Sequence, residues 1–591
     1  MADQTALDLY RHDLVSPRMD HYSHWTPAGH RTLSTGDFLG RCCGLADALV
    51  ELGVAAGDRV MLASDDRPEW HLVDLAVLDL GAVDVPVYET LTSDQLAYQL
   101  VDSGATVAVA ENPEQMGKFL EIRSRCPELR HLIQIEGERA EGVLALDELV
   151  ADRGPGSEAR FWDRAARLDE RKLMTIIYTS GTTGEPKGVM LSHRNVVQNV
   201  LFTLRRMSAD DTDVALEFLP LCHIAERTAG YCYMKTGTRK AYCSVQHAGE
   251  LIRRIRPTIF LAVPRVYEKF HQRVRERVAA GSPLRRRLFR WALDVGREAA
   301  TERVAGRPLT GLSAFRHALA DRLVLGKVRA ALGGRVRFCL TGAAETPPHV
   351  AEFIRSLGVW LVDAYGLTES SPVIAIGGSE PEFLRIGRVG RPLDNLEVRL
   401  APDGELLVRG PSIMIGYWNK PEQTAEAFDE EGFLRTGDIA EIDDEGFIRI
   451  IDRKKDLLVT SGGKNVAPQP IESRLKASAF VDAAVLIGDR RHFIAALLSP
   501  DFEELERWAK ANGVSAIDRR ELVRHPAVHA LYDGHIAEVN KALARYEQIR
   551  EFRVLPTALS VGGGQLTPTM KVKRRVVEAQ FAALIDEMYA G

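Results

Sequence analysis

In the N-terminal part of the chain, short apolar runs alternate with segments whose apolar residues recur at helical spacing. This alternation predicts a sheet covered by helices. Short apolar runs at 59–64, 83–88 and 106–111 have the length and composition of buried strands. Between them, 69–80 and 93–101 carry apolar side chains at helical spacing. Because strands that alternate with helices typically lie parallel in one sheet, we expect a doubly wound α/β fold here.

The same pattern returns twice further along the chain. The near-continuous apolar run at 173–179 predicts a buried strand, followed by a polar glycine loop, a short strand at 189–192 and a helix that begins after Ser192. Two more strands are predicted at 335–340 and 359–363. The sequence therefore predicts more than one doubly wound sheet.

A helix is predicted between these last two strands. Thr346 is a suitable N-cap, Pro347 suits the first helical position, and Gly358 suits the position after the helix. The spacing of the apolar residues, i, i+3, i+4, i+7, predicts that one face of the helix is buried. This apolar stripe consists of Val350, Phe353, Ile354 and Leu357.

Residues 270–335 form a helical, arginine-rich stretch that differs from its surroundings. Two interpretations stay open. The stretch is either a solvated helical insertion with paired charges, or a basic surface whose Phe289 and Trp291 contact anionic lipid. The second interpretation predicts peripheral contact with a membrane surface.

A run of five consecutive charged residues at 452–456 separates two parts of different composition. Such a run is typical of a hinge or linker. Beyond it, short strands and helices mix, which indicates a small α+β domain. We therefore expect a large N-terminal region over 1–451, which includes a distorted β subdomain, and a small mobile C-terminal domain over 457–591.

Composition narrows the class of protein. A chain of 591 residues is too long for one core, since domains average roughly 150 residues. A formal net charge of -6 argues against a nucleic-acid partner. The seven cysteines form no C-x-x-C pair, and the N-terminus resembles no secretory signal. No apolar run is long enough to span a membrane, so we expect a cytoplasmic protein with buried, reduced cysteines.

The loop at 178–188 carries the strongest local chemical signal. Its glycines allow a close backbone approach, its hydroxyls donate hydrogen bonds and its lysine adds a positive charge, which together suit a polyphosphate. It is not a Walker-type loop, because a glycine follows the lysine and no helix begins there. A flexible hairpin tip is the alternative. The residues concerned are Thr179, Ser180, Gly181, Thr182, Thr183, Gly184 and Lys187.

This loop resembles the phosphate loop of the adenylate-forming superfamily, which includes acyl-CoA and aryl-CoA synthetases, peptide-synthetase adenylation domains and luciferases. Four further segments match the superfamily in the same order: the Y-G-x-T-E motif within 363–369, T-G-D at 436–438, the hinge at 452–456 and the catalytic-lysine segment at 567–571. The resemblance covers most of the chain.

The resemblance implies how ATP would be held. Thr368 would bond the α-phosphate, Glu369 would bind Mg²⁺, the Tyr365 ring would stack on adenine, and Asp438 with Arg453 would bond the ribose. A core tyrosine and a turn aspartate are the structural alternatives. The remaining residues assigned to the ATP site are Gly342, Ala343, Ala344, Glu345, Asp363, Ala364, Gly366 and Ile450. His223 matches a wall residue of the acyl pocket, with a purely structural histidine as the alternative.

The resemblance also assigns catalysis to Lys571. A lysine that bridges the carboxylate and the α-phosphate stabilises the developing charge and fixes the geometry of attack. Lys573 is the nearest alternative, because residues two apart in an extended segment lie on the same face. Rotation about Lys455 would then withdraw Lys571. The segment brought toward CoA contains Gly462, Gly463 and Lys464.

Segments at 262–267, 431–439, 446–455, 463–468 and 567–574 resemble the long-chain fatty-acid–CoA ligase subgroup. The implied reaction converts a long-chain fatty acid and ATP, with Mg²⁺, to acyl-AMP and pyrophosphate, and then transfers the acyl group to CoA. The alternatives are a fatty acyl-AMP ligase that loads a carrier protein, a ligase for medium-chain or other acids, and a non-catalytic nucleotide-binding scaffold. Monomer and homodimer both stay open, as does contact with the inner face of the membrane.

Overall fold

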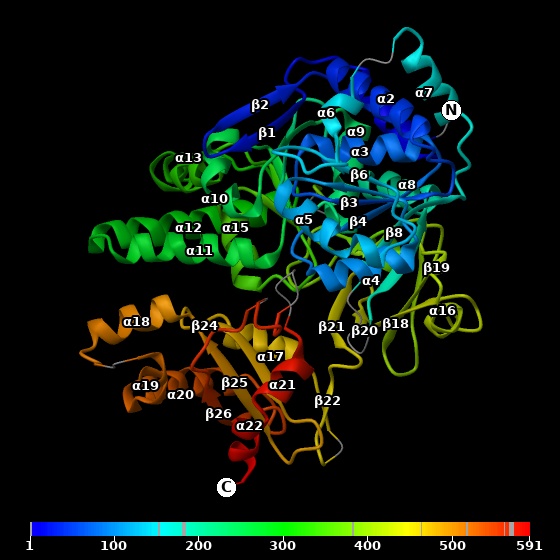
Figure 1. The fold of residues 1–591 in the computed structure, drawn as a ribbon. Coiled ribbons are helices and arrows are strands. Elements are labelled where there is room, and N and C mark those ends of the chain that lie inside the picture. Colours follow the sequence, from blue (N-terminus) through cyan, green and yellow to red (C-terminus); the bar gives the residue numbers. More distant parts are fainter. Residues whose placement is uncertain are drawn as a thin grey trace. The chain divides into compact units, whose positions relative to one another are not determined.

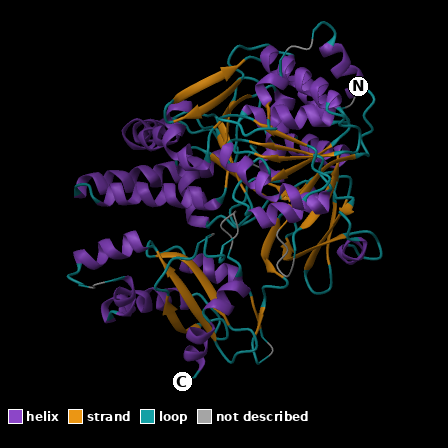
Figure 2. Ribbon diagram, in the orientation of Figure 1, coloured by secondary structure: helices purple, strands orange, loops and turns teal. Residues whose placement is uncertain are grey.

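The computed structural model describes residues 3–151, 154–179, 185–380, 383–462, 464–515, 518–560, 562–566 and 572–590. It confirms the α/β class, with several sheets and many helices (Figures 1 and 2). The chain divides into two compact units. The first comprises 1–399, 407–436 and 442–448, and the second comprises 400–406, 437–441 and 449–591.

An eight-stranded sheet forms one half of the first unit. Its order is β19-β9-β8-β4-β3-β5-β6-β7, and strands β3 to β6 lie parallel to their neighbours. The predicted strands and helices of this region are confirmed to within a few residues. The elements are β3 (Arg59–Ala63), α3 (Pro68–Asp79), β4 (Val83–Val87), α4 (Ser93–Ser103), β5 (Val107–Ala110), β6 (His131–Gln134), β7 (Leu144–Ala145), β8 (Leu173–Thr179), β9 (Lys187–Ser192) and β19 (Gly416–Tyr417).

A nine-stranded sheet forms the other half, in the order β16-β15-β14-β13-β12-β10-β11-β1-β2. Strands β10 to β14 are parallel, as expected for strands joined by helices. Its elements include β1 (Tyr22–Thr26), β2 (Gly29–Leu33), α8 (His193–Leu204), β10 (Val214–Glu217), α9 (Ile224–Thr236), β11 (Arg239–Tyr242), β12 (Ile259–Ala262), β13 (Phe338–Thr341), α15 (Pro348–Ser356), β14 (Trp360–Gly366), β15 (Val373–Ile376) and β16 (Arg391–Pro392).

The start of α15 corrects the prediction by one residue. Pro347 is the N-cap, and the Thr346 hydroxyl instead lies 3.1 Å from the Thr341 hydroxyl at the end of β13. The predicted strand at 335–340 begins only at Phe338, because 335–337 lie outside the ladder with β12. Gly358 follows the helix with a φ of +81°, as predicted for that position.

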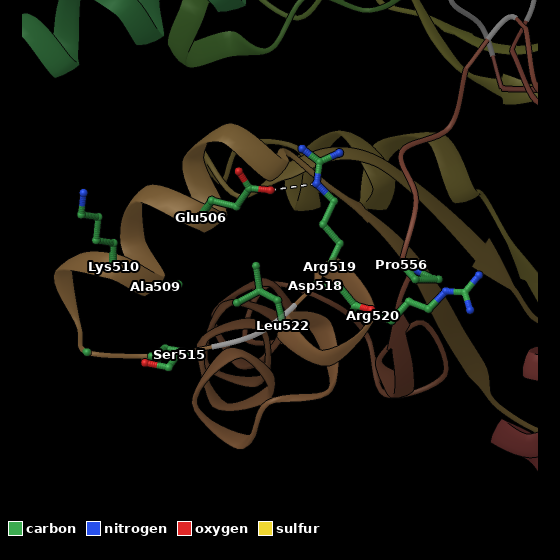
Figure 3. A pocket seen from close by; sticks show the side chains of 11 residues that line it. Glu506, Ala509, Lys510, Ser515, Asp518, Arg519, Arg520, Leu522 and Pro556 are labelled. Atoms are coloured by element: carbon green, nitrogen blue, oxygen red, sulfur yellow. Dashed lines mark hydrogen bonds and ion pairs between the residues drawn. The ribbon is translucent and has the colours of Figure 1, made fainter.

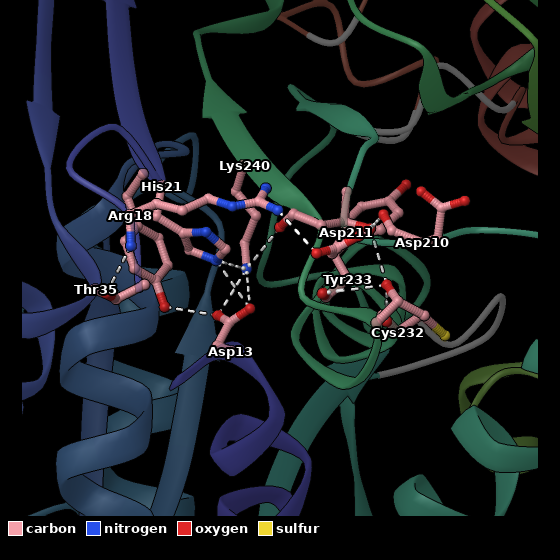
Figure 4. A network of polar contacts seen from close by, with 12 residues as sticks. Asp13, Arg18, His21, Thr35, Asp210, Asp211, Cys232, Tyr233 and Lys240 are labelled. Atoms are coloured by element: carbon pink, nitrogen blue, oxygen red, sulfur yellow. Dashed lines mark hydrogen bonds and ion pairs between the residues drawn. The ribbon is translucent and has the colours of Figure 1, made fainter. Parts of the chain in front are cut away.

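A buried ion cluster fixes the N-terminal residues to the second sheet. The Lys240 Nζ on β11 lies 2.9 and 2.7 Å from the two carboxylate oxygens of Asp13, and His21 Nε2 lies 2.9 Å from the same carboxylate (Figure 4). The Tyr22 hydroxyl donates to it as well, at 2.7 Å. Since Asp13 and Lys240 are almost completely buried, removing either partner would leave an uncompensated charge.

The arginine-rich stretch is helical, as predicted, and it begins at Pro264. However, the Phe289 side chain is only 8% exposed and packs in the core of the first unit. Trp291 is half-buried and packs against the same core. Of the two open interpretations, the one in which both rings contact lipid is therefore wrong for Phe289, which is buried. The elements are α11 (Pro264–Ala279), α12 (Pro283–Val304), α13 (Gly311–Ala320), the π-helical turn η3 (Asp321–Leu325) and α14 (Gly326–Arg329).

A four-stranded sheet provides the predicted β region. Its order is β17 (Glu397–Leu400), β18 (Glu405–Arg409), β20 (Leu434–Ile442) and β21 (Ile448–Arg453). All seven cysteines are buried and unpaired, as expected. Within the described residues, no helix is both long enough and apolar enough to cross a membrane.

The second unit contains a three-stranded sheet with helices on both faces, which confirms the predicted α+β architecture. Alternate residues of β25 point to opposite faces. Ala496 and Leu498 belong to one apolar cluster, whereas Ala495 and Leu497 belong to another. The elements include β24 (Val481–Ile487), β25 (Ile494–Pro500), β26 (Ile549–Val554), α17 (Pro468–Leu475), α18 (Phe502–Ala511), α20 (Pro526–Asn540) and α22 (Ala582–Tyr589).

Candidate functional site

The predicted phosphate loop connects two antiparallel strands of the eight-stranded sheet. Thr179 ends β8 and pairs with Lys187, which begins β9. Five loop residues, Ser180, Gly181, Thr182, Thr183 and Gly184, lie outside the described residues. The described stems place Lys187 at the mouth of the loop.

A tyrosine connects Lys187 to Glu369. The Lys187 Nζ lies 4.9 Å from the centroid of the Tyr417 ring, and the Tyr417 hydroxyl donates to Glu369 Oε1 at 2.9 Å. Burial raises the pKa of Tyr417, and the neighbouring Glu369 carboxylate raises this pKa further. A cation and a carboxylate that are far apart in sequence are thus held beside one ring.

The sequence did not single out Tyr417. It lies on β19, a strand of two residues that pairs antiparallel with β9 and places Tyr417 opposite Val189. Such a short strand has no period to detect. The usable signal was the adjacent aromatic pair Tyr417 and Trp418 after a glycine.

Trp418 fixes the stem of the loop. Its backbone N–H donates to Gly188 O at 2.7 Å, and its indole N–H donates to Asp102 O at 2.8 Å. A Cβ on Gly188 would lie 2.6 Å from Ile176 Cγ2, so the close packing of this stem requires glycine. The Tyr178 hydroxyl donates to the Asp102 carboxylate at 2.6 Å.

Glu369 follows the end of β14, where the strand is irregular. The ladder with β15 shifts register between Tyr365 and Gly366, and a Cβ on Gly366 would lie 1.7 Å from Pro372 O. The chain then turns into the short 3-10 helix η5 (Thr368–Ser370), which carries Thr368 and Glu369. The Met414 N–H donates to Glu369 O at 2.8 Å and anchors this turn to the segment before β19.

Two neighbouring parallel strands end beside each other and bring two predicted segments together. Thr341 on β13 pairs with Asp363 on β14, so 342–345 and 363–366 share the carboxyl edge of the sheet, where open α/β sheets bind ligands. Burial raises the pKa of Asp363 to about 7, although its Thr346 hydrogen bond lowers it. Ala343 and Ala344 are exposed and Glu345 is half-buried; Ala364, Tyr365 and Gly366 are also half-buried.

The predicted ribose pair lies on adjacent strands of the four-stranded sheet. Arg453 Nε on β21 lies 2.9 Å from Asp438 Oδ1 on β20, and the Asp438 side chain is almost completely buried. Ile450 is half-buried on β21. Lys454 contacts Asp403 and Glu405, at 2.5 and 2.9 Å. Exposed Lys455 follows in the turn.

The predicted CoA-contacting segment is a small hairpin. It connects β22 (Leu458–Val459) and β23 (Asn465–Val466), and its backbone is held by Thr460 N–H donating to Lys464 O at 3.0 Å. Gly462 and Lys464 are exposed. Gly463 and Lys571 lie outside the described residues, whereas Lys573 is described and precedes α21 (Arg574–Gln580).

His223 has a structural role at the start of a helix. It is the N-cap of α9, and its Nδ1 accepts a hydrogen bond from Ala225 N–H at 3.2 Å. Capping satisfies one of the free donors of the helix start. The side chain remains half-buried, so its predicted place in an acyl pocket stays a prediction.

A hollow in the second unit is distinct from these residues. It lies between α18 and α19 (Arg519–Arg524), where Arg519 Nε contacts Glu506 Oε1 at 2.8 Å (Figure 3). None of the predicted site residues lines it. Among the described residues, no group of three or more His, Cys, Asp or Glu side chains is arranged to hold a metal ion.

Comparison with known proteins gives a consistent result along the chain. The family model for "AMP-binding enzyme" matches residues 15–418, and that for "AMP-binding enzyme C-terminal domain" matches 455–591. The chain is 36% identical to the long-chain-fatty-acid–CoA ligase FadD15 of Mycobacterium bovis, over 99% of this chain and 97% of that protein. It is 32% identical to the peroxisomal long chain acyl-CoA synthetase 6 of Arabidopsis thaliana, over 92% of this chain and 80% of the relative.

Solved structures share the fold. The anthranilate CoA ligase AuaEII, solved in complex with anthranoyl-AMP, superposes with a TM-score of 0.73 at 19% sequence identity, over 98% of both chains. This likeness extends the match in sequence to the arrangement of sheets and helices.

Proposed function

The chain belongs to the AMP-binding enzyme family, and from this premise we propose that it is a long-chain fatty-acid–CoA ligase. The full-length identity to FadD15 supports the substrate class. The observation that carries the chemistry is the cluster of Lys187, Tyr417 and Glu369. It holds a cation and a carboxylate beside one tyrosine ring, and a metal-bound polyphosphate needs both kinds of group.

The reaction has two steps. A fatty-acid carboxylate oxygen attacks the α-phosphorus of ATP, the bond to the bridging oxygen breaks, and pyrophosphate leaves with the bonding electrons. The CoA sulfur then attacks the acyl carbonyl, the bond to the phosphate oxygen breaks, AMP leaves, and the thiol proton passes to solvent. Acyl-CoA and AMP are the products.

Several residues would hold the nucleotide. Lys187 and the loop 179–184 would contact the β- and γ-phosphates, because ammonium and backbone N–H groups stabilise phosphate charge. Thr368 would bond the α-phosphate and the Tyr365 ring would stack on adenine. Buried Asp438, oriented by Arg453, would accept hydrogen bonds from the ribose hydroxyls. The segment 342–345 would line the adenine and acyl pockets, with His223 on the acyl wall.

Glu369 fits a role in Mg²⁺ binding. Its Oε1 accepts the Tyr417 hydroxyl, and its Oε2 makes no hydrogen bond to any described residue. Magnesium in such sites takes one or two carboxylates together with substrate phosphates, which agrees with a single acidic side chain here. When bound, the ion supplies neutralisation of phosphate charge.

The two steps would use the two parts of the chain differently. We propose that 452–456 is a hinge between 1–451 and 457–591, with Lys455 as its pivot. In the first step Lys571 would bridge the reacting groups. Rotation would then replace it with Gly462, Gly463 and Lys464. The glycines would leave room for the pantetheine arm, and the Lys464 ammonium would contact a phosphate of CoA. We propose a cytoplasmic protein that contacts the inner face of the membrane peripherally.

The assignment is tested by exchange of labelled pyrophosphate into ATP. Exchange that requires both palmitate and Mg²⁺, and that Lys187→Ala reduces about a hundredfold, is expected from the loss of a phosphate contact in the transition state. Absence of exchange in the wild-type protein would favour the non-catalytic scaffold.

A further inference from the structure

An apolar stripe runs along the exposed face of α13 and η3 in the helical insertion. Its members are three, four and four residues apart, which places them on one side of a helix. The exposed fractions are high for such side chains: Leu312 74%, Phe315 66%, Leu319 40% and Leu323 38%.

The opposite side of the same helices is already packed. Ala320 and Leu325 are buried in the core of the first unit, and α13 and η3 both contact α12. The stripe therefore faces away from the core of its own unit. A contiguous exposed apolar stripe of this kind is typical of a surface that meets another apolar phase.

Basic residues flank the stripe. Arg322 and Lys327 are exposed, and among the described residues no carboxylate forms an ion pair with either of them. The one acidic residue of η3, Asp321, is paired with Arg329 at 2.6 Å. Excess positive charge therefore remains beside the apolar side chains.

The insertion as a whole also carries a net positive charge. Over 264–335 it contains 17 Lys and Arg residues against 6 Asp and Glu, whereas the complete chain has 76 against 82. A local basic segment in an acidic protein concentrates positive potential on one part of its surface. Apolar side chains bordered by basic ones match the boundary between lipid head groups and acyl chains.

We propose that the face formed by Leu312, Phe315, Leu319 and Leu323, with Arg322 and Lys327 beside it, is a docking surface for an anionic lipid bilayer. A second copy of the chain fits less well, because it would bring two strongly basic insertions together. This inference rests on the proposed function: a long-chain fatty acid partitions into bilayers, so the surface would bring the enzyme to its substrate.

The surface is tested with the full-length protein and vesicles of 30% phosphatidylglycerol in phosphatidylcholine. We expect the wild-type protein to sediment with these vesicles, and less with pure phosphatidylcholine or at high salt. Combined Phe315→Ser and Leu319→Ser should reduce the bound fraction about tenfold, because the inserting side chains are lost. Combined Arg322→Gln and Lys327→Gln should reduce binding only to the anionic vesicles.

Met19→Ser is the matched control, because Met19 is 79% exposed and lies outside the insertion. It should bind as the wild type does. Equal binding of the control and the Phe315/Leu319 variant, or no binding of the wild type, would overturn the proposal. So would a dimer in vesicle-free solution that the same double variant dissociates. Ligase activity on detergent-dispersed palmitate, measured in parallel, separates failure of this surface from failure of the proposed function.

Discussion

At the scale of single residues, Tyr417 is the side chain that joins the candidate site together. Its ring lies against Lys187 and its hydroxyl bonds Glu369. Neither contact depends on a ligand, so the cation and the carboxylate are already placed in the described structure. Preorganised charges of this kind need no rearrangement when a polyphosphate arrives.

Replacing Tyr417→Phe removes the hydroxyl and keeps the ring. Since a hydrogen bond to a charged group contributes about 1.5–3 kcal/mol, the KM for MgATP should rise roughly tenfold. Steady-state kinetics measure this directly. Tyr532→Phe is a suitable control, because its hydroxyl bonds Phe480 O in the second unit, outside the candidate site. An unchanged KM for Tyr417→Phe would contradict the role of the hydroxyl.

Asp363 should make stability depend on pH. Its folded-state pKa of about 7 lies above the ordinary value of 3.8, so the folded state binds the proton more tightly. The contribution of Asp363 to the free energy of unfolding is therefore complete below about pH 4, and it is lost as pH rises through about 7. Relative to wild type, Asp363→Asn should gain on the order of 2 kcal/mol between pH 5 and pH 8, measured by urea unfolding. Exposed Asp444→Asn is the control, and parallel curves for Asp363→Asn and wild type would refute the assignment.

Most polar residues of the candidate site could be predicted from the sequence, because they belong to motifs with defined neighbours. Lys187, Glu369, Asp438 and Arg453 were all predicted. The ion pair between Asp438 and Arg453 forms because β20 and β21 are neighbouring strands. The motifs alone do not predict this contact. Tyr417 was missed because its position depends on the register of β19 against β9, which is a tertiary property.

At the scale of elements, glycine determines how β14 ends. The ladder of β14 with β15 changes register at Gly366, beside the carbonyl of Pro372. This close approach lets the chain turn into η5, which carries Thr368 and Glu369. The element boundary thereby sets the positions of two predicted site residues.

Gly366→Ala should therefore disrupt the site. A Cβ 1.7 Å from Pro372 O forces the backbone to move, and such overpacking should cost about 3 kcal/mol or more of unfolding free energy. Gly117→Ala is the matched control, since Gly117 lies in α5 (Pro113–Ile122) with open space around it. The control should be neutral or gain about 0.5–1 kcal/mol in urea unfolding. Similar stabilities for both variants would show that the close approach is unimportant.

Most helices and parallel strands were predictable because their apolar periods are long. One error lies where a period ends. Pro347 precedes α15 although Thr346 is the better capping residue, because the Thr346 hydroxyl bonds Thr341 on the neighbouring strand. Phe289 was left with an open surface interpretation, although it packs in the core with Ala292 and Val295 at helical spacing. The abundance of arginine around it concealed that pattern.

At the scale of the whole molecule, the proposal assigns the two half-reactions to one lysine and one hinge. The superfamily motifs that carry this assignment lie on both sides of 452–456. Sequence could identify them but not the movement that would connect them.

Lys571→Ala should separate the half-reactions. Without the bridging ammonium, adenylation should fall by about a hundredfold or more, while thioester formation from supplied acyl-AMP and CoA is retained. Lys573→Ala is the matched control, because it changes the nearest alternative lysine. Equal loss of both half-reactions in Lys571→Ala, or selective loss of adenylation in Lys573→Ala, would show that the role is wrongly assigned.

The most direct test of the central claim is AMP release with ATP and Mg²⁺, with and without CoA, across acetate, octanoate, palmitate and oleate. Each additional buried methylene contributes about 0.8 kcal/mol, so a deep acyl pocket should discriminate strongly between these acids. A long-chain fatty-acid–CoA ligase should release AMP only with CoA present, with the highest kcat/KM for palmitate or oleate. Pyrophosphate release that is independent of CoA, or a maximum at acetate, would contradict this assignment.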